Sequence, residues 1–197
     1  MIAWSLAALA AARTIGDVVV ALPPGSVGGD IGPAGAIEDL DREGVALIPG
    51  GRSRSESVAG ALERVESELV VVHDAARPLA SAELFDEVVA ALDADEKADG
   101  VVAATPVTDT TKEVLRGHEV HRTLDRSSLW SVQTPQAFRT EALRRALDST
   151  ELLAQATDDA MLVERGGGRI LVHTAPPENL KVTTPLDLRI AEMLLQG

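Results

Sequence analysis

Apolar and polar residues form alternating blocks along this chain, and the blocks predict strands and helices in turn. Short apolar runs bounded by glycine, proline or polar residues have the length and β-branched content of buried strands. These runs are Asp17–Leu22, Val45–Ile48, Leu69–His73, Gly100–Thr105 and Arg169–Thr174. Because helical segments separate them, the pattern predicts a three-layer α/β fold with a mostly parallel sheet.

Capping residues mark the expected helices. Ser, Thr and Asp side chains accept hydrogen bonds from the free N–H groups of a first helical turn, so they often stand just before a helix. The expected helices are Ile2–Arg13 packed on the core, Ser55–Glu66 after Gly50-Gly51, a helix from Ser81 to about Leu92, a helix capped by Thr157, and a last helix opening at Thr184-Pro185-Leu186-Asp187. The stretch Gly25–Gly35 is predicted to be a loop.

One segment departs from this alternation of strands and helices, and it predicts a projecting arm. Two polar, β-prone stretches, Lys112–Leu115 and His118–Thr123, meet at Arg116-Gly117, which is typical of a hairpin. Ser128–Gln133 then returns to the sheet. A polar hairpin is marginal alone, so we expect it to pair with a second subunit. The chain is thus predicted to be one domain, residues 1–197, whose dimerisation arm lies within residues 106–134.

Charge and composition narrow the classes of partner. The net charge of −13 argues against binding of nucleic acid, which requires a basic surface. The absence of cysteine excludes a disulfide framework and a thiolate metal site, and it favours a cytoplasmic setting. The apolar run Met1–Ala12 is too short to span a bilayer and lacks a preceding positive charge, so no membrane association is expected.

The clearest candidate chemistry follows the strand at Leu69–His73. Ligands of open α/β sheets bind beyond the carboxyl ends of the strands, and Asp74 lies just past such an end. A single carboxylate suits Mg²⁺, which completes its shell with water and substrate phosphates. Ala75 leaves room for a ligand, and Arg77 offers a two-pronged contact to a phosphate. The alternative is a turn capped by Asp74, with Arg77 as its ion-pair partner.

Other candidate residues are weak when each is taken alone. Gly51 before a helix, with Ser57 in the first turns, resembles a phosphate or nucleotide contact at a helix N-terminus. Taken alone, Lys181 would usually be a solvated strand lysine, and Arg126 would usually form a surface ion pair with Asp125. His73 is interpreted as a hydrogen-bonded residue at a strand end rather than a metal ligand.

The order of the motifs is more specific than any one of them. The segments Gly50–Val58 (GGRSRSESV), Val72–Pro78 (VHDAARP), Pro106–Lys112 (PVTDTTK), Thr123–Phe138 (TLDRSSLWSVQTPQAF), Thr157–Ala160 (TDDA) and Asn179–Glu192 (NLKVTTPLDLRIAE) occur in that order. Together they resemble the 2-C-methyl-D-erythritol 4-phosphate cytidylyltransferase family over nearly the whole chain.

The resemblance implies a Rossmann-like nucleotidyltransferase fold and a transfer of cytidylyl from CTP to methylerythritol phosphate with release of pyrophosphate. It assigns Gly51, Ser57 and Ala75 to the nucleotide, Asp74 to the metal and the polar network, Arg77, Thr134 and Thr157 to the polyol phosphate, and Lys181 and Arg126 to positioning that phosphate. It also implies Mg²⁺ or another divalent cation, and a homodimer in which this arginine comes from the partner subunit.

One part of the family pattern is absent from this sequence. Family members begin with a strand and a glycine-rich loop that carries an arginine and is followed by a Pro-Lys pair; here Met1 stands at the helix after that segment. We therefore expect exposed sheet edges around Asp17–Leu22, poor stability and weak activity. Two alternatives stay open: a cytidylyltransferase for another polyol phosphate such as ribitol 5-phosphate, and a non-catalytic dimerising remnant.

Overall fold

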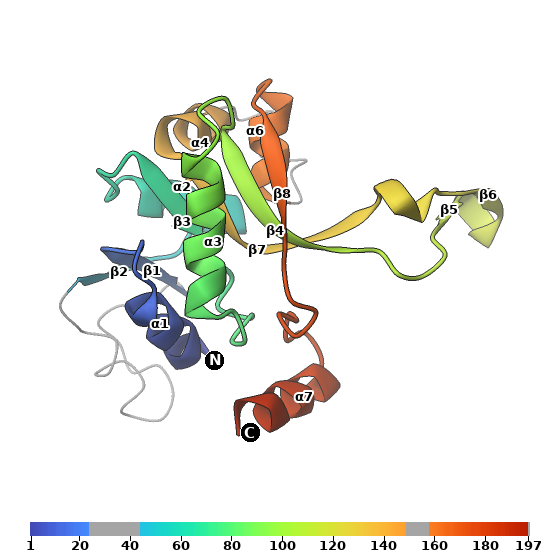
Figure 1. Cartoon of the computed structure of the whole chain (residues 1–197), viewed down its shortest axis with the longest axis horizontal. Helices are drawn as coiled ribbons and strands as arrows, with labels where there is room; N and C mark the ends of the chain where they lie inside the picture. Colours follow the sequence, from blue (N-terminus) through green and yellow to red (C-terminus); the bar gives the residue numbers. More distant parts are fainter. Residues whose placement is uncertain (24–43, 149–157, 197) are drawn as a thin grey trace.

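A four-stranded mixed sheet lies at the centre of the computed structural model, which describes residues 1–23, 44–148 and 158–196 (Figure 1). Its strand order is β3 (Leu69–Val72), β7 (Trp130–Arg139), β4 (Gly100–Pro106) and β8 (Ile170–Thr174). β4 and β8 pair in parallel, whereas β7 runs antiparallel to both of its neighbours. The predicted α/β class is confirmed.

The expectation of a mostly parallel sheet holds for β3, β4 and β8, which run in one direction, and β7 is the antiparallel exception. The chain leaves the sheet along β4, turns back through the arm and re-enters as β7 beside β4 (Figure 1). A chain that reverses in a hairpin-like excursion returns antiparallel, while parallel neighbours need a crossover connection. The sequence prediction of Ser128–Gln133 as the returning strand captured only the start of the ten residues of β7.

A second, separate sheet consists of β1 (Val18–Leu22) and β2 (Val45–Pro49), which pair in parallel. Within the described residues, no ladder joins β1 to β3. A groove of about 730 Å³ lies between them, and residues of both strands line it, among them Val18, Val19 and Val71. The expected exposed edge at β1 is therefore present.

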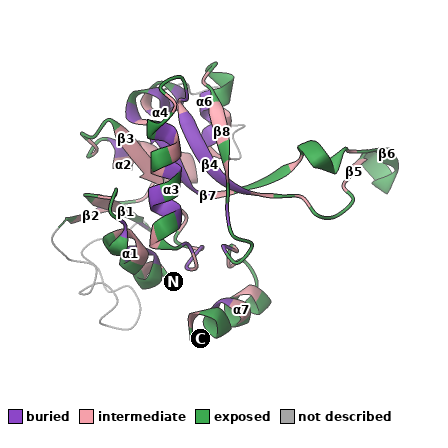
Figure 2. Cartoon of the chain, viewed as in Figure 1, coloured by how far each residue is buried: buried purple, intermediate pink, exposed green. Residues whose placement is uncertain are grey.

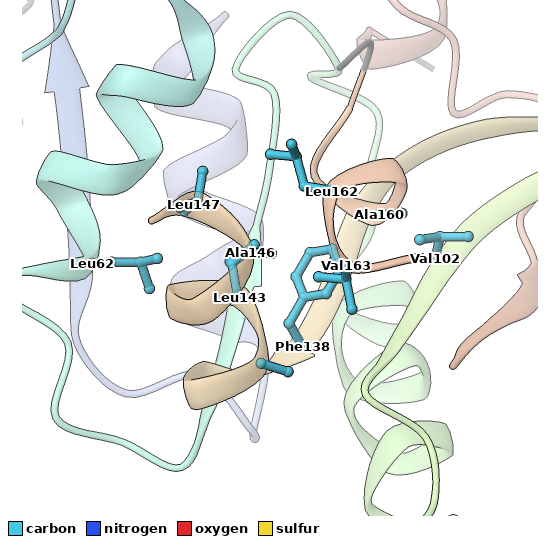
Figure 3. Close-up of a cluster of buried hydrophobic side chains, with 10 residues drawn as sticks. Leu62, Val102, Phe138, Leu143, Ala146, Leu147, Ala160, Leu162 and Val163 are labelled. Atoms are coloured by element: carbon cyan, nitrogen blue, oxygen red, sulfur yellow. The ribbon is translucent and has the colours of Figure 1, made fainter. Parts of the chain in front are cut away.

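Helices cover both faces of the central sheet, which confirms the three-layer prediction. On one face α2 (Arg54–Leu62), α4 (Thr140–Leu147) and α6 (Asp159–Arg165) pack on Val102 and Phe138 (Figure 3). On the other face α3 (Ala82–Asp93) packs on the intervening strand residues Val101, Ala103 and Ala137. Successive strand residues point to opposite faces, so an apolar run such as β4 serves both cores, and Figure 2 shows β4 buried along most of its length.

The first helix, α1 (Ile2–Ala11), is present as predicted but packs on the core only in part. Ser5 and Leu6 are buried, and Ala8 and Leu9 pack beside Phe85 of α3. Trp4 remains half exposed. No helix of the described residues is long and apolar enough to cross a membrane.

Helices α4 and α6 differ from the sequence prediction. α4 was not anticipated, although Ala142, Leu143, Ala146 and Leu147 repeat at helical spacing and are all buried. The N-cap of α6 is Asp158, whose side chain accepts from the Met161 N–H, rather than the predicted Thr157.

Helix α2 ends four residues before the predicted Glu66. Beyond Leu62 the N–H groups of Arg64 and Val65 bond carbonyls only three residues back, so the chain tightens and turns toward β3.

The predicted arm projects far from the rest of the molecule (Figure 1). It pairs β5 (Lys112–Val114) antiparallel with β6 (Val120–Thr123), and η1 (Arg116–His118) forms the tip. Gly117 takes a φ of +82° in that turn, a conformation that favours glycine. The arm exposes apolar side chains, with Val114 48% and Val120 54% exposed.

The C-terminal helix α7 (Pro185–Leu195) begins as its sequence predicts. Thr184 accepts from the Asp187 N–H, and the Asp187 carboxylate accepts from the Thr184 N–H in return, which completes a capping box with proline at the first position. The loop Gly25–Gly35 lies outside the described residues.

Candidate functional site

Asp74 lies just beyond β3 and is the meeting point of three polar segments. Its Oδ1 accepts from Arg54 Nε at 3.1 Å, and its Oδ2 accepts from Lys181 Nζ at 2.7 Å. Its backbone N–H donates to Thr134 Oγ1 at 3.0 Å. The structure thus brings together Asp74, Thr134 and Lys181, which the sequence analysis assigned to one site.

Two cations keep the Asp74 carboxylate ionised. Burial raises its pKa, but the hydrogen bond from Lys181 and the charge of Arg54 outweigh burial, so the pKa of Asp74 lies below its ordinary value. Asp74 is therefore a negative centre at neutral pH, flanked by positive donors that face the strand ends.

Arg54 is a site residue that the sequence analysis missed. It is the first residue of α2, and its guanidinium spans two carboxylates, since Nη1 donates to Asp159 Oδ2 at 2.6 Å while Nε donates to Asp74. Asp159 is 0% exposed, and burial raises its pKa despite the opposing charge of Arg54. In sequence, Arg54 stands in a run of serines and arginines that resembles a solvated surface, so only its spacing from Gly51 offered a signal.

His73 braces the turn that carries Asp74. Its Nδ1 lies 3.0 Å from Thr134 Oγ1, and its Nε2 lies 3.3 Å from the carbonyl of Arg77. The ring packs edge-on against Phe85 at 4.9 Å between centroids. Burial lowers the pKa of His73 to about 4, so the ring is neutral at pH 7. The prediction of a hydrogen-bonded strand-end histidine is confirmed.

Arg77 is buried beneath the site rather than paired with Asp74. Its Nη1 donates to the carbonyl of Asn179 at 2.8 Å, and its backbone N–H closes the turn onto the Asp74 carbonyl. Nε of Arg77 is buried and has no hydrogen-bond partner. The alternative of an Asp74–Arg77 ion pair is therefore wrong, and a phosphate contact by Arg77 stays a prediction.

The glycine pair before α2 shapes the side of the site where the sequence predicts the nucleotide contacts. The N–H of Gly51 donates to Ser57 Oγ at 3.0 Å, and Ser57 Oγ donates to the carbonyl of Ser53 at 3.0 Å. A Cβ on Gly51 would lie 2.3 Å from Glu56 Cβ, a distance that no packed side chain adopts. Only glycine allows the chain to approach the helix so closely at this position.

A cavity of about 290 Å³ joins these elements. Its lining includes Arg54, Ser57, Asp74 and Ala75, together with residues of α1 such as Ser5. Ser57 and Ala75, both predicted nucleotide contacts, therefore face the same space as the carboxylate. Small-molecule sites are commonly concave spaces of this kind with a few polar groups.

The donor set fits a divalent cation that substrate oxygens help to hold. No cluster of three or more His, Cys, Asp or Glu occurs in the part of the chain that the structure describes. Asp74 is the carboxylate that faces the cavity, and each of its oxygens has a second lone pair beside its bond to a cation. Mg²⁺ takes one or two carboxylates and completes its shell with phosphates and water.

The structure does not bring the predicted residue Arg126 to Asp74 within this chain. Arg126 lies in η2 (Arg126–Ser128) beside the arm, is exposed, and donates through Nη1 to the carbonyl of Thr108 at 2.6 Å. Asp125 instead accepts from Ser127, so the alternative of an Asp125–Arg126 pair is not what the side chains form. Thr157 lies outside the described residues.

Comparison with known proteins decides the family. A family model described as 2-C-methyl-D-erythritol 4-phosphate cytidylyltransferase matches residues 1–197. This chain belongs to that cytidylyltransferase family. A relative of that name from Parasynechococcus marenigrum (strain WH8102) is 42% identical and aligns over 99% of this chain and 84% of its own length.

Solved structures of the cytidylyltransferase family share the fold. The enzyme from Thermus thermophilus superposes with a TM-score of 0.80 at 34% identity, covering 100% of this chain and 89% of its own. The 4-diphosphocytidyl-2C-methyl-D-erythritol synthase from Anaerococcus prevotii DSM 20548 gives a TM-score of 0.85 at 27% identity, covering 100% and 86%. The predicted Rossmann-like nucleotidyltransferase fold is confirmed.

Proposed function

We propose that this chain transfers a cytidylyl group from CTP to 2-C-methyl-D-erythritol 4-phosphate and releases pyrophosphate. The observation that carries the proposal is the Asp74 carboxylate held between Lys181 and Arg54 beside a cavity, in a chain of this family. A phosphate oxygen of the polyol attacks the α-phosphorus of CTP, the bond from that phosphorus to the bridging oxygen breaks, and pyrophosphate leaves.

Alignment and charge neutralisation supply most of the acceleration in such a reaction. Two anions approach each other, so positive groups must face both of them. This acidic protein provides such groups locally: Lys181 and Arg54 both bind Asp74, and Arg77 closes the turn that follows it through its backbone N–H.

Lys181 is the residue proposed to hold the attacking phosphate. An ammonium group has three donors, and one of them is bound to Asp74 Oδ2, which leaves two for phosphate oxygens. Asp74 aims the ammonium group, and the half-exposed lysine stem allows it to reach the ligand. Removal of one such preorganised donor costs about 10²–10³ in rate.

Asp74 is the proposed ligand for Mg²⁺ or another divalent cation. When bound, the metal neutralises charge on the phosphates and lowers the barrier to attack. The protein's part is to keep Asp74 ionised and oriented, which the flanking donors and the Thr134–His73 brace do.

The nucleotide is proposed to bind over Gly51, Ser57 and Ala75. Gly51 brings backbone close to the cavity, and Ser57 fixes that backbone by accepting its N–H. Thr134 and Thr157 are proposed to bind the polyol phosphate. Thr134 is buried, and its hydroxyl already bonds Asp74 and His73, so its contribution is to order the polar groups around the acceptor.

A homodimer is proposed through the arm. Arg126 lies at the base of the arm and donates to the nearby Thr108 carbonyl, while the arm exposes Val114, Leu115 and Val120. Pairing of two arms would bury these side chains and bring the Arg126 of each chain toward the site of its partner. The absence of cysteine supports the cytoplasm as the proposed location.

A substrate panel tests the proposed function. Purified protein, CTP and Mg²⁺ are incubated with either 2-C-methyl-D-erythritol 4-phosphate or ribitol 5-phosphate, and pyrophosphate release is followed. We expect release with the first acceptor and at most a few per cent of that rate with the second. Release with ribitol 5-phosphate alone would reject the proposed acceptor, and release with neither would favour a non-catalytic protein.

A further inference from the structure

Arg54 makes contacts that go beyond neutralising a buried acid. Its Nη1 donates to Asp159 Oδ2 at 2.6 Å, and its Nε donates to Asp74 Oδ1 at 3.1 Å. The two acceptors come from different segments, the first residue of α6 and the turn after β3. The single guanidinium therefore ties the start of α2 to both of them.

Arg54 forms a bridge between Asp159 and Asp74, and its Asp159 end is buried and fixed. Asp159 is 0% exposed, and its Oδ1 has no hydrogen-bond partner, so the bond from Arg54 is essential to its charged form. Side chains that are locked by buried partners hold their orientation better than solvated ones. Arg54 is thus held by Asp159 and in turn directs Asp74.

The Asp74 end of the bridge fixes the orientation of the Asp74 carboxylate. Arg54 occupies Oδ1 of Asp74, which leaves Oδ2 to Lys181. Arg54 also follows Gly51 by three residues and precedes Ser57 by three, so the start of α2 lies between two of the proposed nucleotide contacts. A shift of α2 would therefore move the Asp74 carboxylate through the Arg54 side chain.

We infer that Arg54 is a positioning residue for the transfer reaction, which orients Asp74 relative to Lys181 and couples the nucleotide-binding turn to the acceptor side. This inference rests on the proposed function for its rate measurements. The competing explanation is that Arg54 only neutralises Asp159 and has no part in the reaction.

A pair of variants separates these explanations. Arg54→Met leaves Asp159 buried and unpaired, so its melting temperature is expected to fall by roughly 10 °C. Adding Asp159→Asn removes the unpaired charge and is expected to recover most of that loss. If Arg54 positions Asp74, the double variant stays at least tenfold slower than the wild type in single-turnover product formation from CTP and 2-C-methyl-D-erythritol 4-phosphate. Recovery of the rate to within about twofold would overturn the inference.

Arg54→Lys is the second variant, in case the methionine variants do not fold. Lysine keeps a positive charge for Asp159 but cannot bridge two carboxylates with a rigid fork. We expect a melting temperature within a few degrees of the wild type and a rate about fivefold to tenfold lower, whereas a wild-type rate would overturn the inference. Asp159→Asn alone removes the anchor but keeps Arg54, so it is the reference for the double variant and should be faster than it. Arg52→Lys, at an exposed arginine of the same segment, is the control and should stay within about threefold.

Calorimetric binding of 2-C-methyl-D-erythritol 4-phosphate with Mg²⁺ gives a readout that requires no turnover. The affinity of Arg54→Lys is expected to be at least fivefold weaker than that of the wild type, and an unchanged affinity would count against the inference. A wild-type protein that binds both substrates but makes no product would refute the proposed reaction, while the affinity difference would still decide the role of Arg54.

Discussion

Asp74 is the residue on which the proposed chemistry depends most. Lys181 and Arg54 each take one of its oxygens, and Thr134 takes its backbone N–H. Because the cations hold its pKa below the ordinary value, the group is ionised at neutral pH. A residue in this position can bind a metal and orient a lysine together.

Replacing Asp74 with asparagine tests that dual role. Asp74→Asn keeps the shape of the side chain but removes its charge. Lys181 then loses the carboxylate that orients its ammonium group, and the metal loses a carboxylate ligand. We expect a rate about 10²–10³ lower and a higher half-saturating Mg²⁺ concentration, measured by titrating Mg²⁺ in the transfer assay. Asp93→Asn, at the exposed end of α3, is the matched control and should behave as wild type. An unchanged Mg²⁺ dependence would exclude Asp74 as the metal ligand.

Residues next to a strand end or glycine pair were predictable, and residues defined by distant partners were not. Asp74 and Lys181 stand in recognisable motifs, and the structure joins them. Arg54 and Asp159 are separated by 105 positions, and their pairing depends on how α2 and α6 pack on the sheet. In the linear sequence, Arg54 has the same surroundings as the exposed Arg52, which pairs with Glu56 of α2.

At the scale of elements, helix α2 offers an internal comparison of two glycines. Gly51 stands where a Cβ would meet Glu56 Cβ at 2.3 Å, whereas a Cβ on Gly60 would find Ile48 Cδ1 at 3.8 Å, an ordinary contact. We expect Gly51→Ala to displace the start of α2, lower the melting temperature and weaken CTP binding at least tenfold. Gly60→Ala should instead stabilise the protein by about 0.5–1 kcal/mol, because alanine favours a helix interior. Calorimetry on both variants measures the contrast, and equal CTP affinities would contradict it.

The capping box of α7 makes the helix sensitive to acid. Hydrogen bonds from Thr183 and Thr184 lower the pKa of Asp187 to about 2, from an ordinary value of 3.8. A carboxyl group with a depressed pKa contributes stability that is fully present above its unfolded pKa and is lost as the pH falls through the folded one. Amide exchange in α7 should therefore accelerate, relative to the other helices, between about pH 4 and pH 2.

The variant Asp187→Asn separates this effect from general acid unfolding. With the carboxylate absent, α7 amides should exchange faster already at pH 7 and show no further loss specific to this helix below pH 4. Glu192→Ala, on the exposed side of the same helix, is the control. Protection of α7 that is the same in Asp187→Asn and wild type at pH 7 would exclude the capping box as its source.

Strands were the most predictable elements, because each apolar run is short and closed by turn residues. The direction of β7 was not predictable from such local signals. It follows from the arm, which turns the chain back beside β4. Helix α4 was missed although its apolar spacing was present, since its arginines made the segment resemble a solvated surface.

At the scale of the whole molecule, the arm is the feature whose exposed apolar side chains the fold of a single chain does not explain. It projects away from the sheet and exposes Val114 and Val120. If two arms pair, sedimentation should give a dimer for the wild type. Val114→Asp with Val120→Asp should then give a monomer with a rate at least tenfold lower, because Arg126 no longer reaches a partner's site. Val172→Asp, an equally exposed valine of β8, is the control, and a dimeric double variant would contradict this assignment.

The most direct test of the whole account is product formation by the purified chain. CTP, 2-C-methyl-D-erythritol 4-phosphate and Mg²⁺ are mixed with excess enzyme, and the cytidine diphosphate product is followed by ³¹P NMR in wild type and in Lys181→Ala, with Lys97→Ala as the control. The account predicts product with the wild type and with Lys97→Ala, and a rate about 10²–10³ lower with Lys181→Ala. Product formed equally well by Lys181→Ala, or by none of the three proteins, would contradict it.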